Sequence, residues 1–134
     1  MKLKTHIFSL CDYASVTRDG KMNLMGVFRQ LFIEELPAQF VKFYIAASIE
    51  GKPDSKHRIH ISIHKPNGKL AVPREDRILY IGPAGIVNLI TDILNMPIDN
   101  IGDYTIKITT VNKELIGKSK FQVINLKEKQ KVTN

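Results

Sequence analysis

One segment alternates isoleucine with polar residues, and this pattern constrains the fold more than any other feature of the chain. Successive side chains of a β-strand point to opposite faces of a sheet, so strict alternation predicts a strand with one buried and one solvent-facing side. The alternation runs from His57 to Lys65, which we therefore expect to be a strand. The apolar positions are Ile59, Ile61 and Ile63, and the polar positions between them are His60, Ser62 and His64.

Six prolines divide the rest of the chain into short segments, none of which is typical of a long amphipathic helix. Proline is excluded from central strands, so these positions mark connections. The intervening segments are rich in Ile, Val, Phe, Tyr and Thr, which suit a pleated sheet. We expect strands at residues 5–14, 22–33, 41–50, 57–65, 70–72, 102–111 and 115–126, with a further apolar run at 78–81.

Local signals refine this reading. Asp19-Gly20 predicts a turn because glycine tolerates a positive φ, so the first two strands should form a hairpin. Gly26, inside the second segment, indicates a bulge or a close backbone contact. Residues 86–94 fit a helical face or a strand face, and this choice stays open. Residues 95–101, which include Pro97, are expected to be a loop.

The predicted class is all-β: an antiparallel two-sheet β-sandwich, immunoglobulin-like, with Greek-key connections. About eight or nine short strands with regular turn signals favour it over alternating strand and helix units. A chain of 134 residues fits one domain, so we expect a single sandwich domain at 1–126 and a basic, flexible C-terminal tail at 127–134. The expected core is Phe8, Leu24, Val27, Phe43, Ile45, Ile59, Ile61, Ile63, Leu89, Tyr104, Ile106, Ile108, Phe121 and Val123.

The net charge of +7 is concentrated near the C-terminus, where residues 118–134 hold five lysines and a single acid, Glu128. Such an end can contact phosphates, but it more often keeps a terminus solvated, so nucleic acid is not the expected partner. The candidate anion-binding residues are Lys118, Lys120, Lys127, Lys129 and Lys131.

Four polar residues lie in or beside apolar strands: Asp12, Asn23, Asp103 and Tyr104. The favoured interpretation is structural, because an unpaired buried polar group costs about 1–3 kcal/mol and such residues normally hydrogen-bond turns and bulges. A tyrosine in a glycine-aspartate-tyrosine step can also tie a corner of an immunoglobulin-like sandwich to the backbone through its hydroxyl. The alternative is a carboxylate pair for acid–base chemistry or for a cation.

Neither histidines nor cysteine predict a metal centre or a nucleophile. At about 3.3 Å per residue, His60 and His64 stand roughly 13 Å apart, too far to share one zinc ion, and His57 points to the other face. Cys11, the single cysteine, is expected to be a buried core thiol, since cysteine is among the most buried residue types. No metal, cofactor or catalytic residue is expected.

Two parts of the sequence carry a resemblance. The first contains Cys11-Asp12-Tyr13-Ala14, Asp19-Gly20-Lys21, Asn23-Leu24 and Gly26-Val27-Phe28, and the second contains Asn88-Leu89 and Gly102-Asp103-Tyr104. In these blocks, over about residues 5–124, the chain resembles a family of uncharacterised bacterial proteins of similar length. The resemblance implies a β fold and nothing catalytic, and it leaves the lysine-rich end outside.

The sequence therefore favours a non-catalytic binding or assembly module, expected to be cytoplasmic because one cysteine fits a reducing compartment. Its partner would be a second copy or another protein at an exposed strand edge. Two alternatives remain: binding of nucleic acid or an anionic surface through the lysine-rich tail, and a small enzyme with a pocket among the end loops. No run of about 18 apolar residues is present, so no membrane span is expected.

Overall fold

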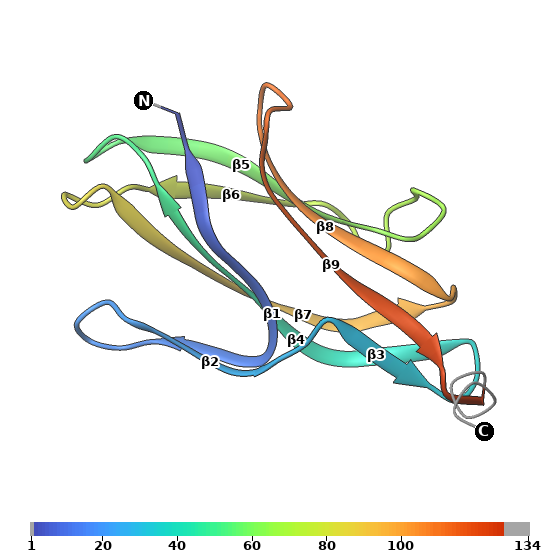
Figure 1. Cartoon of the computed structure of the whole chain (residues 1–134). Coiled ribbons are helices and arrows are strands. Elements are labelled where there is room, and N and C mark those ends of the chain that lie inside the picture. Colours follow the sequence, from blue (N-terminus) through green and yellow to red (C-terminus); the bar gives the residue numbers. More distant parts are fainter. Residues whose placement is uncertain (1, 128–134) are drawn as a thin grey trace.

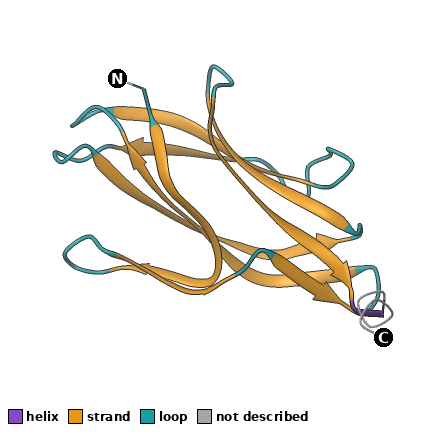
Figure 2. Cartoon of the chain, viewed as in Figure 1, coloured by secondary structure: helices purple, strands orange, loops and turns teal. Residues whose placement is uncertain are grey.

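The computed structural model describes residues 2–127, and nearly all regular structure within them is β (Figures 1 and 2). The predicted all-β class is confirmed. No helix of the described residues is long and apolar enough to cross a membrane. The strands are β1 (Lys4–Val16), β2 (Met22–Val27), β3 (Gln30–Ile33), β4 (Ala38–Glu50), β5 (Lys56–His64), β6 (Glu75–Tyr80), β7 (Ile86–Ile98), β8 (Gly102–Thr110) and β9 (Leu115–Asn125).

These strands form two sheets: a four-stranded sheet in the order β2-β1-β4-β7 and a five-stranded sheet in the order β3-β9-β8-β5-β6. The expectation of purely antiparallel pairing is wrong at one place, because β3 runs parallel to β9, with Gln30 opposite Gln122. The five-stranded sheet also curls into a half-barrel instead of forming a flat layer. The expected hairpin of the first two strands is present as β1 and β2.

The segment 22–33 is two strands, one in each sheet, and its prediction as a single strand is wrong. Gly26 has a φ of +69°, and a side chain there would overlap the carboxylate of Asp12. Beyond this point the amide of Phe28 donates to the carbonyl of Leu10 at 3.0 Å, and the Phe28 ring packs against Phe121 of the other sheet. Phe28 therefore contacts both sheets at the point where the chain passes from the four-stranded sheet to the five-stranded sheet.

Residues 86–98 settle the open choice between helix and strand. They form β7, so the loop expected at 95–101 is wrong over its first residues. Pro97 is tolerated because β7 lies at the edge of its sheet, where a missing amide proton breaks no ladder on the open side. The strand expected at 70–72 is also wrong, because only one isolated bridge, from His64 to Leu70, forms there.

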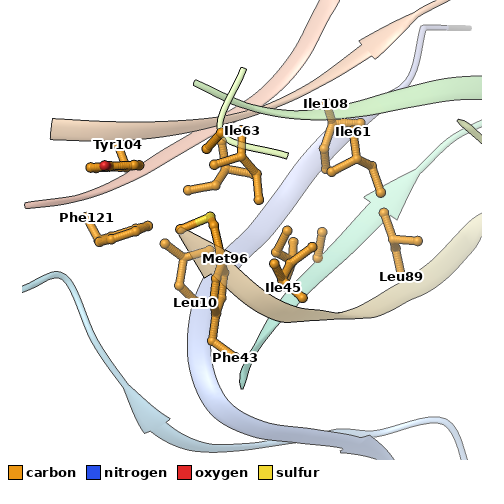
Figure 3. Close-up of a cluster of buried hydrophobic side chains, with 14 of the residues drawn as sticks. Leu10, Phe43, Ile45, Ile61, Ile63, Leu89, Met96, Tyr104, Ile108 and Phe121 are labelled. Atoms are coloured by element: carbon orange, nitrogen blue, oxygen red, sulfur yellow. The ribbon is translucent and has the colours of Figure 1, made fainter. Parts of the chain in front are cut away.

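The core lies between the two sheets and draws buried side chains from both (Figure 3). Ile59, Ile61 and Ile63 are at most 3% exposed, which confirms the predicted dry face of β5. Burying such a side chain stabilises the fold by about 1.5–3 kcal/mol. Figure 3 shows Leu10, Ile45, Leu89 and Met96 of the four-stranded sheet opposite Ile61, Ile63 and Ile108 of the five-stranded sheet.

Three members of the expected core are not fully buried, and all three come from the first two strands. Val27 is 58% exposed, while Phe8 and Leu24 are half-buried. Leu24 of the β1–β2 hairpin packs instead on a second, smaller cluster, together with Tyr44 of β4 and Ile90 of β7. That cluster contains Cys11, Ala14 and Ala46.

Candidate cationic groove

Two adjoining hollows lie along the outer face of the five-stranded sheet and at its β3–β9 side. Their volumes are about 860 and 600 Å³, and both are bordered by Asp103 and Lys118. We call them together the cationic groove, because five of their bordering residues are cations and Asp103 is the one carboxylate among the described residues that line them. The cations are Arg29, Lys65, Lys107, Lys118 and Lys120.

The larger hollow forms where β9 lacks a strand neighbour. β3 pairs only with residues from Gln122 to Asn125, so the preceding part of β9 has no strand on that side. Phe8 and Phe28 border the opening there, and Gly117 brings β9 close to the Phe8 ring. The hollow therefore has aromatic side chains beside a charged rim.

Two lysines of the groove are direct cross-strand neighbours. Lys107 on β8 faces Lys118 on β9 in the antiparallel register, and like charges in such positions destabilise a sheet. Within the described residues, neither lysine has an ion-pair partner. Arg29, a third cation of the groove, has no ion-pair partner among these residues either. A negatively charged ligand would supply the missing counter-charge.

Carboxylates neutralise the other two cations of the groove. Lys120 lies 3.3 Å from Asp103, and Lys65 lies 2.8 Å from Asp99. The hydrogen bond from Lys65 lowers the pKa of the Asp99 carboxyl below its usual value. These pairs leave Arg29, Lys107 and Lys118 as the unneutralised cations of the groove among the described residues.

The lysines nominated from sequence have different positions. Lys118 and Lys120 are part of β9, within the strand expected at 115–126. Their side chains alternate with the buried Phe121 and therefore lie on the outer face of the sheet. Lys127 is exposed just after the strand, whereas Lys129 and Lys131 lie outside the described residues.

Asp103 and Tyr104 are adjacent on β8 and point to opposite faces. Asp103 borders the groove, while Tyr104 is fully buried. The Tyr104 hydroxyl accepts hydrogen bonds from the backbone amides of Asp99 and Asn100, each at 3.3 Å, and faces the Asp99 carboxylate at 3.5 Å. Burial raises the pKa of Tyr104, so its hydroxyl stays protonated.

Asp12 and Asn23 lie on the β1–β2 hairpin, and their contacts are local. Asn23 donates to the Ser15 hydroxyl at 3.5 Å, and Asp12 sits against Gly26. Asp12 belongs to the four-stranded sheet and Asp103 to the other, so the structure does not unite them as an acid–base pair. In the described part of the chain, no three metal-ligating side chains gather at one point.

One serine–histidine contact has the outline of an activated hydroxyl. The ring of His64 contacts the Gly68 carbonyl through Nδ1 at 3.2 Å, which makes Nε2, 2.9 Å from the Ser62 hydroxyl, the acceptor. Such a pair activates a nucleophile only if a substrate reaches it. Ser62 is 9% exposed and is therefore poorly accessible to a substrate. The contact of His64 with the Gly68 carbonyl links β5 to the following turn.

Cys11 occupies the small cluster beneath the hairpin and is fully buried. Burial is the main cause that raises the pKa of its thiol. A protonated, enclosed thiol is a poor nucleophile, which fits packing and not catalysis.

Sequence reasoning missed Arg29, Lys65 and Lys107 as groove residues. The alternation of Thr105 and Lys107 with buried Ile106 and Ile108 could have placed Lys107 on an outer face. Its position opposite Lys118 depends on the pairing of β8 with β9, which one sequence does not reveal.

The fold is similar to parts of larger known structures. An alkylpurine DNA glycosylase, AlkC, of Pseudomonas fluorescens, solved bound to DNA containing an abasic site analog, superposes with a TM-score of 0.54 at 12% identity. The match covers 90% of this chain but 30% of the glycosylase chain. A β-glucosidase from Listeria innocua matches at a TM-score of 0.48 and 11% identity, over 91% of this chain and 16% of that one. At this identity the likeness concerns the fold alone.

No curated protein sequence matches the chain. A family profile, described as a family of unknown function, matches residues 6–124, which is most of the chain and includes both sheets and the cationic groove. The chain therefore belongs to the family of unknown function DUF6941.

Proposed function

We propose that this protein is a non-catalytic binding module that holds an anionic partner in the cationic groove. The observation that carries the proposal is the Lys107–Lys118 pair, two like charges in direct register with no counter-ion among the described residues. The uncompensated pair costs stability in the free protein. An anion bound between the two lysines would remove that cost, so binding and local stability are coupled.

Charge balance supports the same function. The groove brings five cations and a single described carboxylate together on one side of the five-stranded sheet. Clefts lined by charge of one sign concentrate counter-ions and accelerate their association. The partner is thus expected to bind in a strongly salt-dependent manner.

Heparin affinity chromatography tests this proposal. We expect Lys107→Gln/Lys118→Gln to elute at a clearly lower salt concentration than the parent protein, because the double variant lacks the central charges. The matched control is Lys4→Gln/Lys52→Gln, which removes the same charge from two exposed lysines outside the groove. Equal elution shifts for both double variants would mean that retention reports net charge, and the proposal would fail.

The finer fold class is also a proposal: an immunoglobulin-like sandwich with Greek-key connections. The Tyr104 hydroxyl contacts to the corner between β7 and β8 support it. In that class such a tyrosine fixes the loop before its own strand. An experimental structure in which the two sheets do not face one another would contradict it.

A second candidate function is assembly through an edge strand, and the β1–β2 hairpin favours it. β2 is an edge strand, and its Met25 and Val27 are 63% and 58% exposed, beside the half-exposed Tyr13. Open edges with apolar side chains pair readily with another chain. Light scattering should then show a dimer that Val27→Lys dissociates; a parent protein of monomer mass at all concentrations rules it out.

A further inference from the structure

We infer that the anionic partner of the cationic groove is a single-stranded nucleic acid. This inference rests on the proposed function and specifies its ligand. Three features of the groove support it: the spacing of the cations, the aromatic side chains beside them, and the paired amides at the end of the row.

The cations have the spacing of a polymer of charges. Lys118 and Lys120 are two residues apart on one strand and therefore stand about 7 Å apart, a separation comparable to that of successive phosphates in an extended polynucleotide. Lys107 lies across from Lys118 on the next strand, about 5 Å away. A backbone crossing β9 and β8 would thus meet Lys107, Lys118 and then Lys120, the last of which also contacts Asp103. A single small anion would use only Lys107 and Lys118.

Aromatic rings border the larger hollow beside this row of charge. Phe32 on β3 is 38% exposed, and Phe8 and Phe28 are half-buried at the same opening. Unpaired bases stack on such rings, and this stacking is tolerant of sequence. A duplex hides the faces of its bases and an acidic peptide has none, so the rings favour a single strand over both.

Amide side chains complete the wall of the hollow. Gln30 and Gln122 are register partners across β3 and β9, and both line the opening. A carboxamide both donates and accepts hydrogen bonds, as the edges of bases do. The shared boundary residues Asp103 and Lys118 join this hollow to the second one, which extends the path over β8 toward β5.

The test uses fluorescence anisotropy with a labelled oligothymidylate of about 12 nucleotides. We expect the parent protein to bind it at low salt. Lys107→Gln/Lys118→Gln should weaken binding at least tenfold and lower the slope of log affinity against log salt by about 1.4, or roughly 0.7 per lost phosphate contact. The control Lys4→Gln/Lys52→Gln should leave that slope unchanged.

A variant of the aromatic wall separates this inference from the proposed function. Phe32→Ala should weaken oligonucleotide binding about tenfold, because stacking contributes strongly per base, yet leave heparin retention unchanged. Phe32→Leu repeats the test with a side chain that keeps most of the packing, and thermal melting verifies that each variant is folded.

The outcomes are distinguishable. If the same sequence in duplex form, or a polyglutamate peptide, competes as well as the single strand, or if neither Phe32 variant affects oligonucleotide binding, the nucleic-acid assignment is overturned while anion binding stands. If no oligonucleotide binds but heparin elution still depends on Lys107 and Lys118, the same conclusion follows. If neither probe responds to those lysines, both the inference and the proposed function fail.

Discussion

The two faces of the five-stranded sheet come from alternate residues of the same strands but have opposite properties. The inner face carries Ile106, Ile108 and Phe121, all fully buried, and the outer face carries Lys107 and Lys118, which share no counter-ion among the described residues. The inner side chains stabilise the fold, and we propose that the outer ones bind an anionic partner. Because neighbouring residues point in opposite directions, substitutions one position apart should have unrelated consequences.

The largest expected effect is on the inner face, from Phe121→Ala. This ring stacks on Tyr104 and contacts the rings of Phe28, Phe40 and Phe43. Its removal should lower the free energy of unfolding by about 3–5 kcal/mol, from lost burial and the cavity left behind. Urea denaturation measures this; a loss below about 1 kcal/mol would contradict the placement of the ring at the core.

Tyr104→Phe should have the next largest effect. The substitution keeps the ring but removes the acceptor of the Asp99 and Asn100 amides, which should cost about 1–3 kcal/mol. Tyr80→Phe is the matched control, because Tyr80 is 64% exposed and should change stability little. Equal melting temperatures for the two variants would show that the hydroxyl does not fasten the corner.

Lowering the pH should weaken the contacts of Asp99, which link the two faces of the sheet. Asp99 contacts both the groove residue Lys65 and the buried Tyr104 hydroxyl. Lys65 lowers the pKa of this carboxyl in the folded state. Its stabilising contribution is therefore present above the unfolded pKa of about 3.9 and is lost as pH falls through the lower folded pKa. Asp99→Asn should lose less stability than the parent between about pH 5 and pH 2, measured by denaturation at each pH. Parallel curves would refute this.

The smallest expected change in stability has the opposite sign. Lys118→Thr removes one of two facing like charges and should raise the free energy of unfolding by a few tenths of a kcal/mol, roughly, while weakening retention on heparin. A gain in stability together with a loss of binding would separate the two faces most clearly. If Lys118→Thr destabilises the sheet, the lysine pair does not repel.

The parts of the fold and of the groove that were predictable are those encoded in neighbouring residues of the sequence. The alternation around Ile59, Ile61 and Ile63 predicted β5 and its buried side, because a strand's two faces are encoded in consecutive residues. The crossing after Val27 and the parallel pairing of β3 with β9 were not predicted, since both depend on contacts with residues distant in the sequence. For the same reason the groove was found only in part: Lys118, Lys120 and Asp103 were nominated, but their meeting with Lys107 and Arg29 depends on strand register.

The parallel pairing of β3 with β9 also affects the order in which the molecule can form during synthesis. β3 has β9 as its only strand neighbour in the described chain, and that neighbour is the last strand to be translated. Until the ribosome has released residues up to Asn125, the short segment from Gln30 to Ile33 has no ladder to join. Long-range pairings of this kind slow folding, and nascent chains fold as translation supplies them. The edge on which the larger hollow depends therefore forms only after the other strands of the described residues have been translated.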